Sequence, residues 1–337
     1  MGLSDSPLAL VTGASGFVGG SLARRLLDDG YTVRLLLRRP EAAPHVLRER
    51  CEIFHGDLNN ASVMRQAVKG CDYVFHCAAN ANTWDTQDNY EAANLRGVHS
   101  LLMALSRNNL SLKRLVHLST VDVYGYPDAA CDEQSATRKT GYGYGDSKLD
   151  GETLLRSYGD AHNIPYVILR PTNIIGPGSQ FIEQIDDALR NRSMLTIDRG
   201  SANAGLVYID NLIDYILWSA TSDTALNNIY NVRDDYDVNW QEFITRLQQL
   251  TGDKSNVRNL PYRAAKLTAS VLEALYRVGG RTSEPPLHRL LVDMFGKTCG
   301  HPGDKIRSAS GIHSAIAFDE AMALSVVALQ AGQSKAA

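Results

Sequence analysis

Tyr144 and Lys148 lie four residues apart in the segment YGDSK, which places both side chains on one face if the segment begins a helix. A lysine ammonium beside a phenol stabilises the phenolate, so the sequence predicts that Lys148 lowers the pKa of Tyr144. A tyrosine adjusted in this way can exchange a proton with a substrate oxygen near neutral pH. The pair therefore predicts a general acid or base, although the same spacing also arises by chance.

Three glycines, Gly13, Gly16 and Gly19, follow the apolar run Leu8–Val11. Apolar residues then recur every four positions over 18–26, which predicts an amphipathic helix. A strand, a glycine turn and a helix N-terminus together suit a diphosphate, because backbone N–H groups are available there and side chains would block the ligand. The sequence therefore predicts a nucleotide site in preference to a plain turn.

Two arginines, Arg38 and Arg39, follow the second apolar run, Thr32–Leu37. Dinucleotide folds normally carry an acidic residue at this place for the ribose 2′-hydroxyl. A guanidinium instead matches a phosphate with paired donors, so Arg38 predicts NADP in preference to NAD. A solvated pair of arginines is the alternative. Asp57 closes the third apolar run, where a carboxylate could accept a hydrogen bond from an adenine amino group.

Short apolar runs alternate with helical stretches in the first half of the chain, which predicts βαβ units and an α/β Rossmann fold with a doubly wound parallel sheet. The expected strands are Leu8–Val11, Thr32–Leu37, Cys51–His55, Tyr73–Cys77, Arg114–Leu118 and Tyr166–Arg170. The expected helices lie around Ser21–Asp29, Ala61–Lys69, Tyr90–Asn108 and Ser147–Tyr158. Ligands of such sheets bind at the carboxyl ends of the strands. Ser119 and Thr120 follow one of these ends, where a hydroxyl would face the cofactor, although both residue types are also common strand-end caps.

The pattern becomes less regular beyond Pro171. The expected elements there are helices near Phe181–Arg190 and Leu212–Ala220, strands at Gly205–Ile209 and Ile229–Val232, and mostly helix from about Asp237. The predicted partition is a nucleotide-binding domain over residues 1–170, rejoined by about 205–232, and a smaller, mostly helical substrate lobe over 171–204 and 233–337.

The composition is that of an ordinary globular protein, with 44% hydrophobic and 21% charged residues and a net charge of −3. Nothing in it indicates nucleic-acid binding, so a small molecule is the expected partner. The 5 cysteines lack CxxC spacing and the 9 histidines form no ligand-pair motif, which predicts reduced thiols and no metal. No apolar run is long enough to cross a membrane and residues 1–7 lack a signal-peptide pattern, so a cytoplasmic location is expected.

Together these segments resemble the extended short-chain dehydrogenase/reductase family, also called the NAD-dependent epimerase/dehydratase family. The resemblance extends almost from end to end, and it rests on the order and spacing of the motifs rather than on any one of them. The matching segments are TGASGFVG (12–19), GDL (56–58), HCAA (76–79), LSTVDVYG (118–125), YGDSK (144–148), LRPTNIIGPG (169–178) and VYIDNL (207–212).

The resemblance implies a role for each matching position. The implied cofactor-binding residues are Gly13, Ser15, Gly16, Phe17, Val18, Gly19, Arg38, Asp57, Leu58, Ala78, Ala79, Tyr144, Lys148 and Pro171. Tyr144 is implied as the general acid or base, and Lys148 as the group that binds the nicotinamide ribose. Thr120, in preference to Ser119, is expected to hold the reacting oxygen, and these implied catalytic residues are Thr120, Tyr144 and Lys148.

Substrate binding is implied for Thr120 and Asn173, whereas Asn94 is expected to be structural. Helices near Tyr90–Asn108 and Ser147–Tyr158 often form dimers in this family, so a homodimer is expected. The C-terminal helix Leu267–Val278 either packs in the core or lines a site for a hydrophobic substrate. With Pro285–Pro286 it resembles the 3β-hydroxysteroid-dehydrogenase-like or carbonyl reductase branch.

Two branches of the family stay open. Val121–Asp122 occupies the place where the resembling dehydratases carry an Asp–Glu pair, which disfavours a dehydratase. Residues 203–205 lack the arginine with which sugar enzymes bind the substrate diphosphate, which disfavours a nucleotide-sugar substrate. Asn173, in contrast, is retained as in sugar enzymes. The sequence predicts an NADP(H)-dependent oxidoreductase that transfers hydride between nicotinamide and a ketone or secondary alcohol of a small, hydrophobic substrate. The alternative is a nucleotide-sugar 4-epimerase with bound NAD; a non-enzymatic NADP-binding sensor is less favoured, because Tyr144 and Lys148 are both present.

Overall fold

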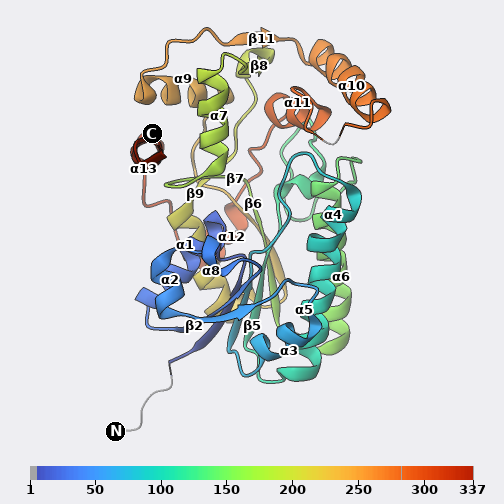
Figure 1. The fold of residues 1–337 in the computed structure, drawn as a ribbon, viewed down its shortest axis with the longest axis vertical. Helices are drawn as coiled ribbons and strands as arrows, with labels where there is room; N and C mark the ends of the chain where they lie inside the picture. The colour runs from blue at the N-terminus through green and yellow to red at the C-terminus, as the bar shows by residue number, and fades with distance from the viewer. Residues whose placement is uncertain (1–5, 282, 337) are drawn as a thin grey trace.

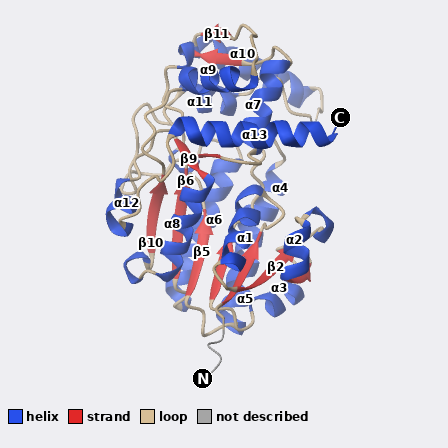
Figure 2. Cartoon of the chain, turned by 90° about the vertical axis from the view of Figure 1, so that its left-hand side faces the viewer, coloured by secondary structure: helices blue, strands red, loops and turns tan. Residues whose placement is uncertain are grey.

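The computed structural model describes residues 6–281 and 283–336, and in this part of the chain seven parallel strands form the main sheet, in the order β10-β6-β5-β4-β1-β2-β3. These strands are β1 (Leu8–Thr12), β2 (Thr32–Leu37), β3 (Glu52–His55), β4 (Tyr73–His76), β5 (Arg114–Leu118), β6 (Tyr166–Pro171) and β10 (Asn228–Val232). Helices cover both faces of the sheet (Figure 2). Strand order reverses between β1 and β4, so the predicted doubly wound α/β Rossmann fold is confirmed. Residues 1–5, 282 and 337 of the predicted domains lie outside the described residues.

Each face of the sheet buries its own core. The flanking helices are α1 (Phe17–Asp28), α2 (His45–Arg50), α3 (Ala61–Val68), α4 (Gln87–Glu91), α5 (Gly97–Asn108), α6 (Tyr144–His162) and α8 (Ile209–Thr221). Successive residues of a strand point to opposite faces, so Val11 packs with Leu22 of α1 and Leu212 of α8, whereas Leu10 packs with Leu101 of α5 and Leu155 of α6. Because the central strands are buried on both faces, they appear in the sequence as continuous apolar runs.

A smaller set of elements lies above the carboxyl ends of the main strands (Figure 1). Its elements are β7 (Asn173–Ile175), α7 (Gln180–Arg190), β8 (Leu195–Ile197), β9 (Leu206–Tyr208), α9 (Trp240–Thr251), β11 (Arg258–Leu260), α10 (Tyr262–Val278) and α11 (Arg289–Gly296). The chain ends with α12 (Asp304–Ser310) and α13 (Phe318–Ala336). Trp240 joins several of these elements, because its ring lies 5.8 Å from that of Phe181 and 4.5 Å from that of Phe295.

The expected strand at Gly205–Ile209 exists in a shorter form, but β9 pairs with β7 in a small separate sheet rather than with the main sheet. β10 (Asn228–Val232) rejoins the main sheet beside β6, as the sequence predicts for Ile229–Val232. Strands β7, β8 and β11 were not predicted. Each of them has three residues, which is too short to show a two-residue alternation.

The helix expected over Tyr90–Asn108 is divided, since α4 is followed by a π-helical turn (Ala92–Arg96) before α5 begins. α6 crosses this turn at Gly151, where a Cβ would lie 2.5 Å from the Asn94 carbonyl oxygen. Glycine is therefore required for the close approach of the two helices. Within the described residues, no helix is both long enough and apolar enough to pass through a lipid bilayer.

Candidate active site

The turn between β1 and α1 lies directly against the loop that follows β4. Gly13 adopts a φ of +77°, and a Cβ there would lie 2.7 Å from the backbone nitrogen of Ala78. A Cβ at Gly19 would lie 2.4 Å from the Gly13 carbonyl oxygen. Gly16 is the N-cap of α1 and provides no side-chain hydrogen bond to the helix. The first N–H groups of α1 are therefore available to an anion, and this turn fits the pyrophosphate of a dinucleotide.

The other residues predicted to bind the cofactor follow the ends of neighbouring strands. Ser15 is exposed at the tip of the first turn, and Phe17 and Val18 are half-buried at the start of α1. Beyond β3 and β4 the predicted positions are Asp57, Leu58, Ala78 and Ala79. Since parallel strands end at one edge of the sheet, these positions line the same edge.

Arg38 directly follows β2 and its side chain is exposed. Arg34, earlier in the same strand, is committed to an ion pair with Glu52 at 2.7 Å. Among residues 6–281 and 283–336, the structure assigns no ion pair to the Arg38 guanidinium, whereas the Arg38 carbonyl oxygen is bonded to His55 Nε2 at 3.1 Å. The guanidinium is therefore available to a phosphate at the position where the sequence predicts one.

Thr120 and Tyr144 come together at the carboxyl end of β5. Thr120 is 7% exposed and caps a 3₁₀ turn by accepting a hydrogen bond from the Asp122 backbone nitrogen at 3.2 Å. Tyr144 is the first residue of α6, and the next residue, Gly145, packs on this turn, where a Cβ would lie 3.0 Å from the Asp122 carbonyl oxygen. The turn after β5 and the start of α6 thus bring the Thr120 hydroxyl close enough to the Tyr144 phenol to influence its pKa.

Burial raises the pKa of Tyr144 above its ordinary value, and the charge of Asp122 raises this pKa further. The neighbouring Thr120 hydroxyl partly offsets the rise. Burial also raises the pKa of Asp122, to about 6, so this carboxyl is ionised at neutral pH. Tyr144 consequently holds its proton firmly at neutral pH in this structure.

Lys148 lies one turn along α6 and is 3% exposed. Its ammonium donates a hydrogen bond to the Leu118 carbonyl oxygen at 2.5 Å, and burial lowers its pKa to about 8. The prediction that Lys148 lowers the pKa of Tyr144 is wrong for this arrangement. The ammonium is bonded to β5 instead, and the environment of the phenol is set by burial and by Asp122.

Asn94 connects the π-helical turn to its surroundings. Its side-chain nitrogen donates to the Asn80 carbonyl oxygen at 3.0 Å and to Ser147 Oγ at 2.9 Å, and its side-chain oxygen accepts from the Asn80 nitrogen at 2.8 Å. These three bonds hold the loop after β4 and the start of α6 to the π-helical turn.

Pro171 ends β6 and pairs in register with Val232, while Asn173 begins β7. The Asn173 side-chain nitrogen donates to the Ala204 carbonyl oxygen at 2.7 Å. This hydrogen bond fixes the segment 203–205, in which the arginine of the sugar enzymes is absent. Within the described residues, no three His, Cys, Asp or Glu side chains gather as a metal site would require.

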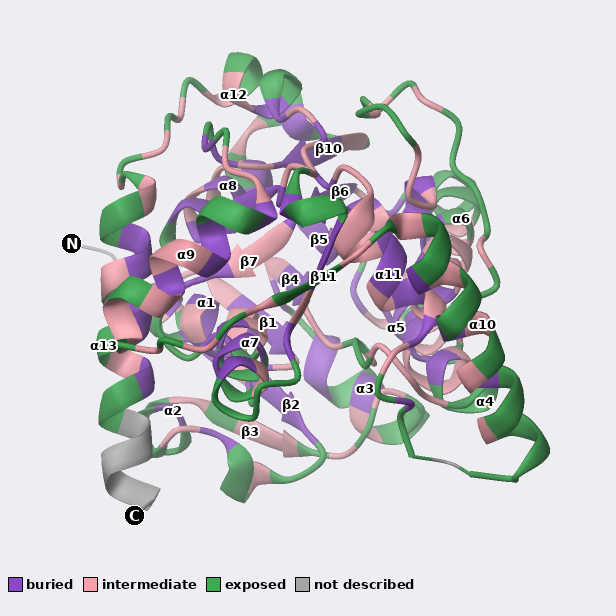
Figure 3. Ribbon diagram, turned by 90° about the horizontal axis from the view of Figure 1, so that it is seen from above, coloured by how far each residue is buried: buried purple, intermediate pink, exposed green. Residues whose placement is uncertain are grey.

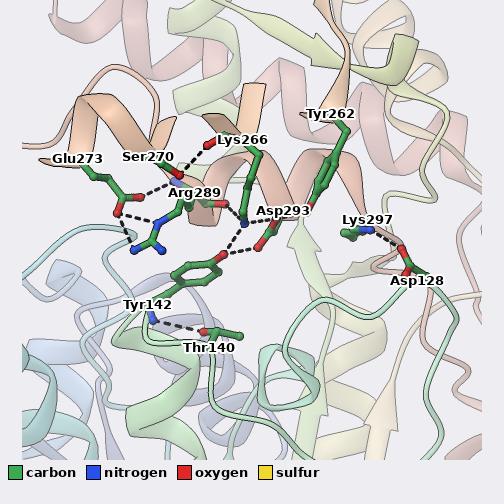
Figure 4. Close-up of polar contacts among 10 residues, drawn as sticks. All are labelled: Asp128, Thr140, Tyr142, Tyr262, Lys266, Ser270, Glu273, Arg289, Asp293 and Lys297. Atoms are coloured by element: carbon green, nitrogen blue, oxygen red, sulfur yellow. Dashed lines mark hydrogen bonds and ion pairs between the residues drawn. The ribbon is translucent and has the colours of Figure 1, made fainter. Parts of the chain in front are cut away.

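One polar cluster above the site was not predicted from the sequence (Figure 4). The Tyr142 hydroxyl, two residues before Tyr144, donates to Asp293 and accepts from Lys266 Nζ at 2.5 Å. Tyr262 also donates to Asp293, at 2.6 Å. The cluster ties the loop before Tyr144 to α10 and α11. No sequence signal could have revealed it, because Tyr142 and Asp293 are 151 residues apart.

A sequence profile of the NAD dependent epimerase/dehydratase family matches residues 9–232. The chain is similar to a 4-hydroxy-2-methyl-3-oxo-4-farnesyl-3,4-dihydroquinoline-1-oxide ketoreductase of Stigmatella aurantiaca, with 29% identity over 89% of this chain and 90% of that protein. It is also similar to a 2-alkyl-3-oxoalkanoate reductase of Shewanella oneidensis, with 26% identity over 93% of this chain and 84% of that protein.

The fold is similar to the crystal structure of UDP-glucuronic acid 4-epimerase from Bacillus cereus in complex with NAD. The TM-score is 0.74 and the identity 20%, over 96% of this chain and 99% of that one, so this likeness shows the fold alone. The profile match, in contrast, spans most of the chain and contains both the Gly13–Gly19 turn and the Tyr144–Lys148 pair. The chain therefore belongs to the NAD-dependent epimerase/dehydratase family, and it is an NAD(P)-dependent enzyme that acts on CH–OH and C=O groups.

Proposed function

We propose that this enzyme uses NADP(H) to interconvert a ketone and a secondary alcohol on a small hydrophobic substrate. The observation that carries the proposal is the pairing of an exposed Arg38 after β2 with the adjacent Thr120 and Tyr144 hydroxyls after β5. Arg38 favours a phosphorylated dinucleotide, and the two hydroxyls suit a carbonyl oxygen. A homodimer through α5 and α6 and a cytoplasmic location are further parts of the proposal.

Several of the predicted cofactor residues have a specific task in this proposal. Gly13, Gly16 and the first turn of α1 would hold the pyrophosphate, Arg38 the 2′-phosphate and Asp57 the adenine. Lys148 would bind the nicotinamide ribose. NADPH, when bound, supplies the hydride for reduction of the carbonyl carbon.

The chain's own hydroxyls would orient and protonate the substrate. Thr120 and Tyr144 would both donate hydrogen bonds to the carbonyl oxygen, where negative charge develops during reduction. Tyr144 would then give its proton to that oxygen. Tyr144 holds its proton at neutral pH, so it is present in the protonated form that the acid in the reduction direction requires.

The hydrophobic substrate is supported by the two relatives, whose names describe reductases of a farnesylated quinoline oxide and of a 2-alkyl-3-oxoalkanoate. The test is to incubate the purified chain with NADPH and a series of 2-alkyl-3-oxo acids of increasing chain length. We expect NADPH oxidation, with kcat/KM rising with the length of the alkyl chain. Absence of oxidation with every ketone, together with conversion of a nucleotide sugar, would overturn the proposal.

A nucleotide-sugar 4-epimerase is the second candidate, and the retained Asn173 favours it. Such an enzyme would carry NAD through purification and would be stabilised against heat by UDP or dTDP. The Asn173 side-chain nitrogen already donates to the Ala204 carbonyl oxygen, so it supports sugar binding only weakly.

Replacing Arg38 by aspartate is expected to lower kcat/KM with NADPH by roughly 10- to 100-fold and to favour NADH, since charge-assisted hydrogen bonds contribute about 1.5–3 kcal/mol. Kinetics with both cofactors measure this effect. Arg48→Asp, which makes the same charge change on the exposed surface of α2, is the matched control and should leave the preference unchanged. An unaltered preference in Arg38→Asp would rule out the 2′-phosphate role.

Replacing Asp122 by asparagine is expected to move the activity profile for alcohol oxidation to lower pH. The Asp122 carboxylate, with a pKa of about 6, is ionised above that pH and raises the pKa of Tyr144. Its removal makes the phenolate, the base in the oxidation direction, easier to form. The profile of kcat/KM against pH measures the shift, with Asp150→Asn on α6 as the control. A shift to higher pH would contradict this electrostatic account.

A further inference from the structure

Helix α10 directs several charged side chains inward and exposes a row of apolar side chains to solvent. On the inner side Glu273 is buried and accepts hydrogen bonds from the Arg289 nitrogen at 2.6 Å and from Arg289 Nε at 2.9 Å. Lys266 forms an ion pair with Asp293 at 2.5 Å. Figure 4 shows these side chains directed from α10 toward α11 and the Tyr142 loop. Small residues, Ala265 and Ala269, complete the inner face.

The outer face of α10 carries an apolar stripe. Leu267, Val271, Leu275 and Val278 are 69%, 52%, 63% and 90% exposed, and their spacing of four, four and three residues aligns them along one side of the helix. These four side chains therefore do not pack in the core, which is one of the two roles expected for the segment, whereas Leu272 and Tyr276 are half-buried. Figures 1 and 3 show α10 at the outer edge of the molecule, and much of its ribbon is coloured exposed in Figure 3.

Positive charge borders the stripe. The segment from Lys254 to Arg281 contains 6 basic residues and 1 acidic residue, in a chain whose net charge is −3. The single acid, Glu273, is buried on the inner face. Arg263 and Arg277 flank the stripe and are exposed, although Arg277 also lies 3.7 Å from the Glu273 carboxylate, and Arg281 follows the helix. Glu284 lies in the next loop, but its carboxylate bonds to Thr83 and His288.

We infer that the outer face of α10 is a docking surface for an anionic lipid membrane, on which the enzyme binds peripherally. An exposed apolar stripe bordered by arginines is the pattern of helices that lie in the lipid interface, where apolar side chains enter the acyl boundary and cations meet anionic headgroups. The basic residues beside the stripe favour a membrane over a second copy of this chain as the partner of this face. Two copies of the face would bring like charges together, whereas anionic headgroups complement them.

Vesicle flotation of the full-length protein tests the surface, and it needs no substrate, so its result is independent of the proposed function. The vesicles are phosphatidylcholine alone or phosphatidylcholine with phosphatidylglycerol. We expect the wild type to float with the anionic vesicles, less so at high salt, and not with phosphatidylcholine alone. The double variant Leu267→Glu/Val271→Glu should lower the bound fraction by about tenfold or more, and Arg263→Glu/Arg277→Glu should also lower it.

Leu110→Glu is the matched control, because Leu110 is 90% exposed and belongs to the loop between α5 and β5, on a different part of the chain from α10. It should bind vesicles as the wild type does. All substituted positions are exposed, and circular dichroism verifies that each variant is folded. The docking surface is refuted if the wild type floats with neither vesicle, or if the α10 variants bind unchanged. It is equally refuted if sedimentation shows that the wild type self-associates and that the α10 variants do not.

Discussion

Replacing Tyr144 by phenylalanine is expected to reduce the rate of ketone reduction by about 10²–10⁴-fold, the range that a positioned acid or base contributes. The change removes a single oxygen, so the ring can still occupy its half-buried position at the start of α6. The Thr120 hydroxyl remains to hold the substrate oxygen, but no group gives it a proton. Affinity for NADPH should change little, because the glycine turn and Arg38 are untouched.

Stopped-flow or steady-state kinetics measure the loss, and a fluorescence titration with NADPH measures the retained affinity. Tyr158→Phe, the same substitution further along α6, is the control and should keep normal turnover. Its hydroxyl interacts with Ser106 and Met103 rather than with the site. Near-normal turnover in Tyr144→Phe would remove Tyr144 from the mechanism.

Removing Glu152 is expected to destabilise the fold by about 3–5 kcal/mol, the cost of leaving a buried partner charge uncompensated. Arg170 donates to Glu152 at 2.9 and 2.7 Å, and the two side chains are 3% and 2% exposed. Arg170 also donates to the Tyr124 hydroxyl at 2.9 Å. The pair therefore locks α6 and β6 to the turn after β5, the same elements that position Tyr144 and Thr120.

Urea unfolding of Glu152→Ala measures this loss. Asp150→Ala breaks a surface ion pair in which Lys139 and Asp150 are 56% and 32% exposed. This change should lower the free energy of unfolding by less than about 1 kcal/mol. Replacing both Glu152 and Arg170 by methionine should restore much of the lost stability, because no charge is then left buried without its partner. A double variant less stable than Glu152→Ala would show that the pair itself stabilises the fold strongly.

The main sheet could be predicted because its strands are buried on both faces. Thr32–Leu37 and Arg114–Leu118 are apolar runs of this kind, and both strands begin and end where the sequence predicts. The smaller elements above the sheet gave no such signal. β8 and β11 have three residues each and depend on pairing with one another across more than sixty residues of chain. The direction of the apolar face of α10 could not be foreseen either, since it follows from the ion pairs of its inner face.

The candidate site was predictable in its members but not in its electrostatics. Spacing alone selects Tyr144 and Lys148, because a helix repeats its face every four residues. The direction of the pKa shift of Tyr144 was predicted wrongly, since it depends on how deeply the phenol is buried and on the nearby Asp122. The burial of the phenol and the position of Asp122 depend on the turn after β5, so they cannot be predicted from the residue spacing within α6.

Transfer of deuterium from labelled NADPH tests the central claim most directly. The enzyme is incubated with NADPH that carries two deuterium atoms at nicotinamide C4 and with a 2-alkyl-3-oxo acid, and the alcohol is analysed by mass spectrometry. The proposed function predicts one deuterium on the carbinol carbon in the wild type and almost no product with Tyr144→Phe. Unlabelled substrate, together with inversion of a nucleotide sugar by NAD that stays on the enzyme, would contradict it.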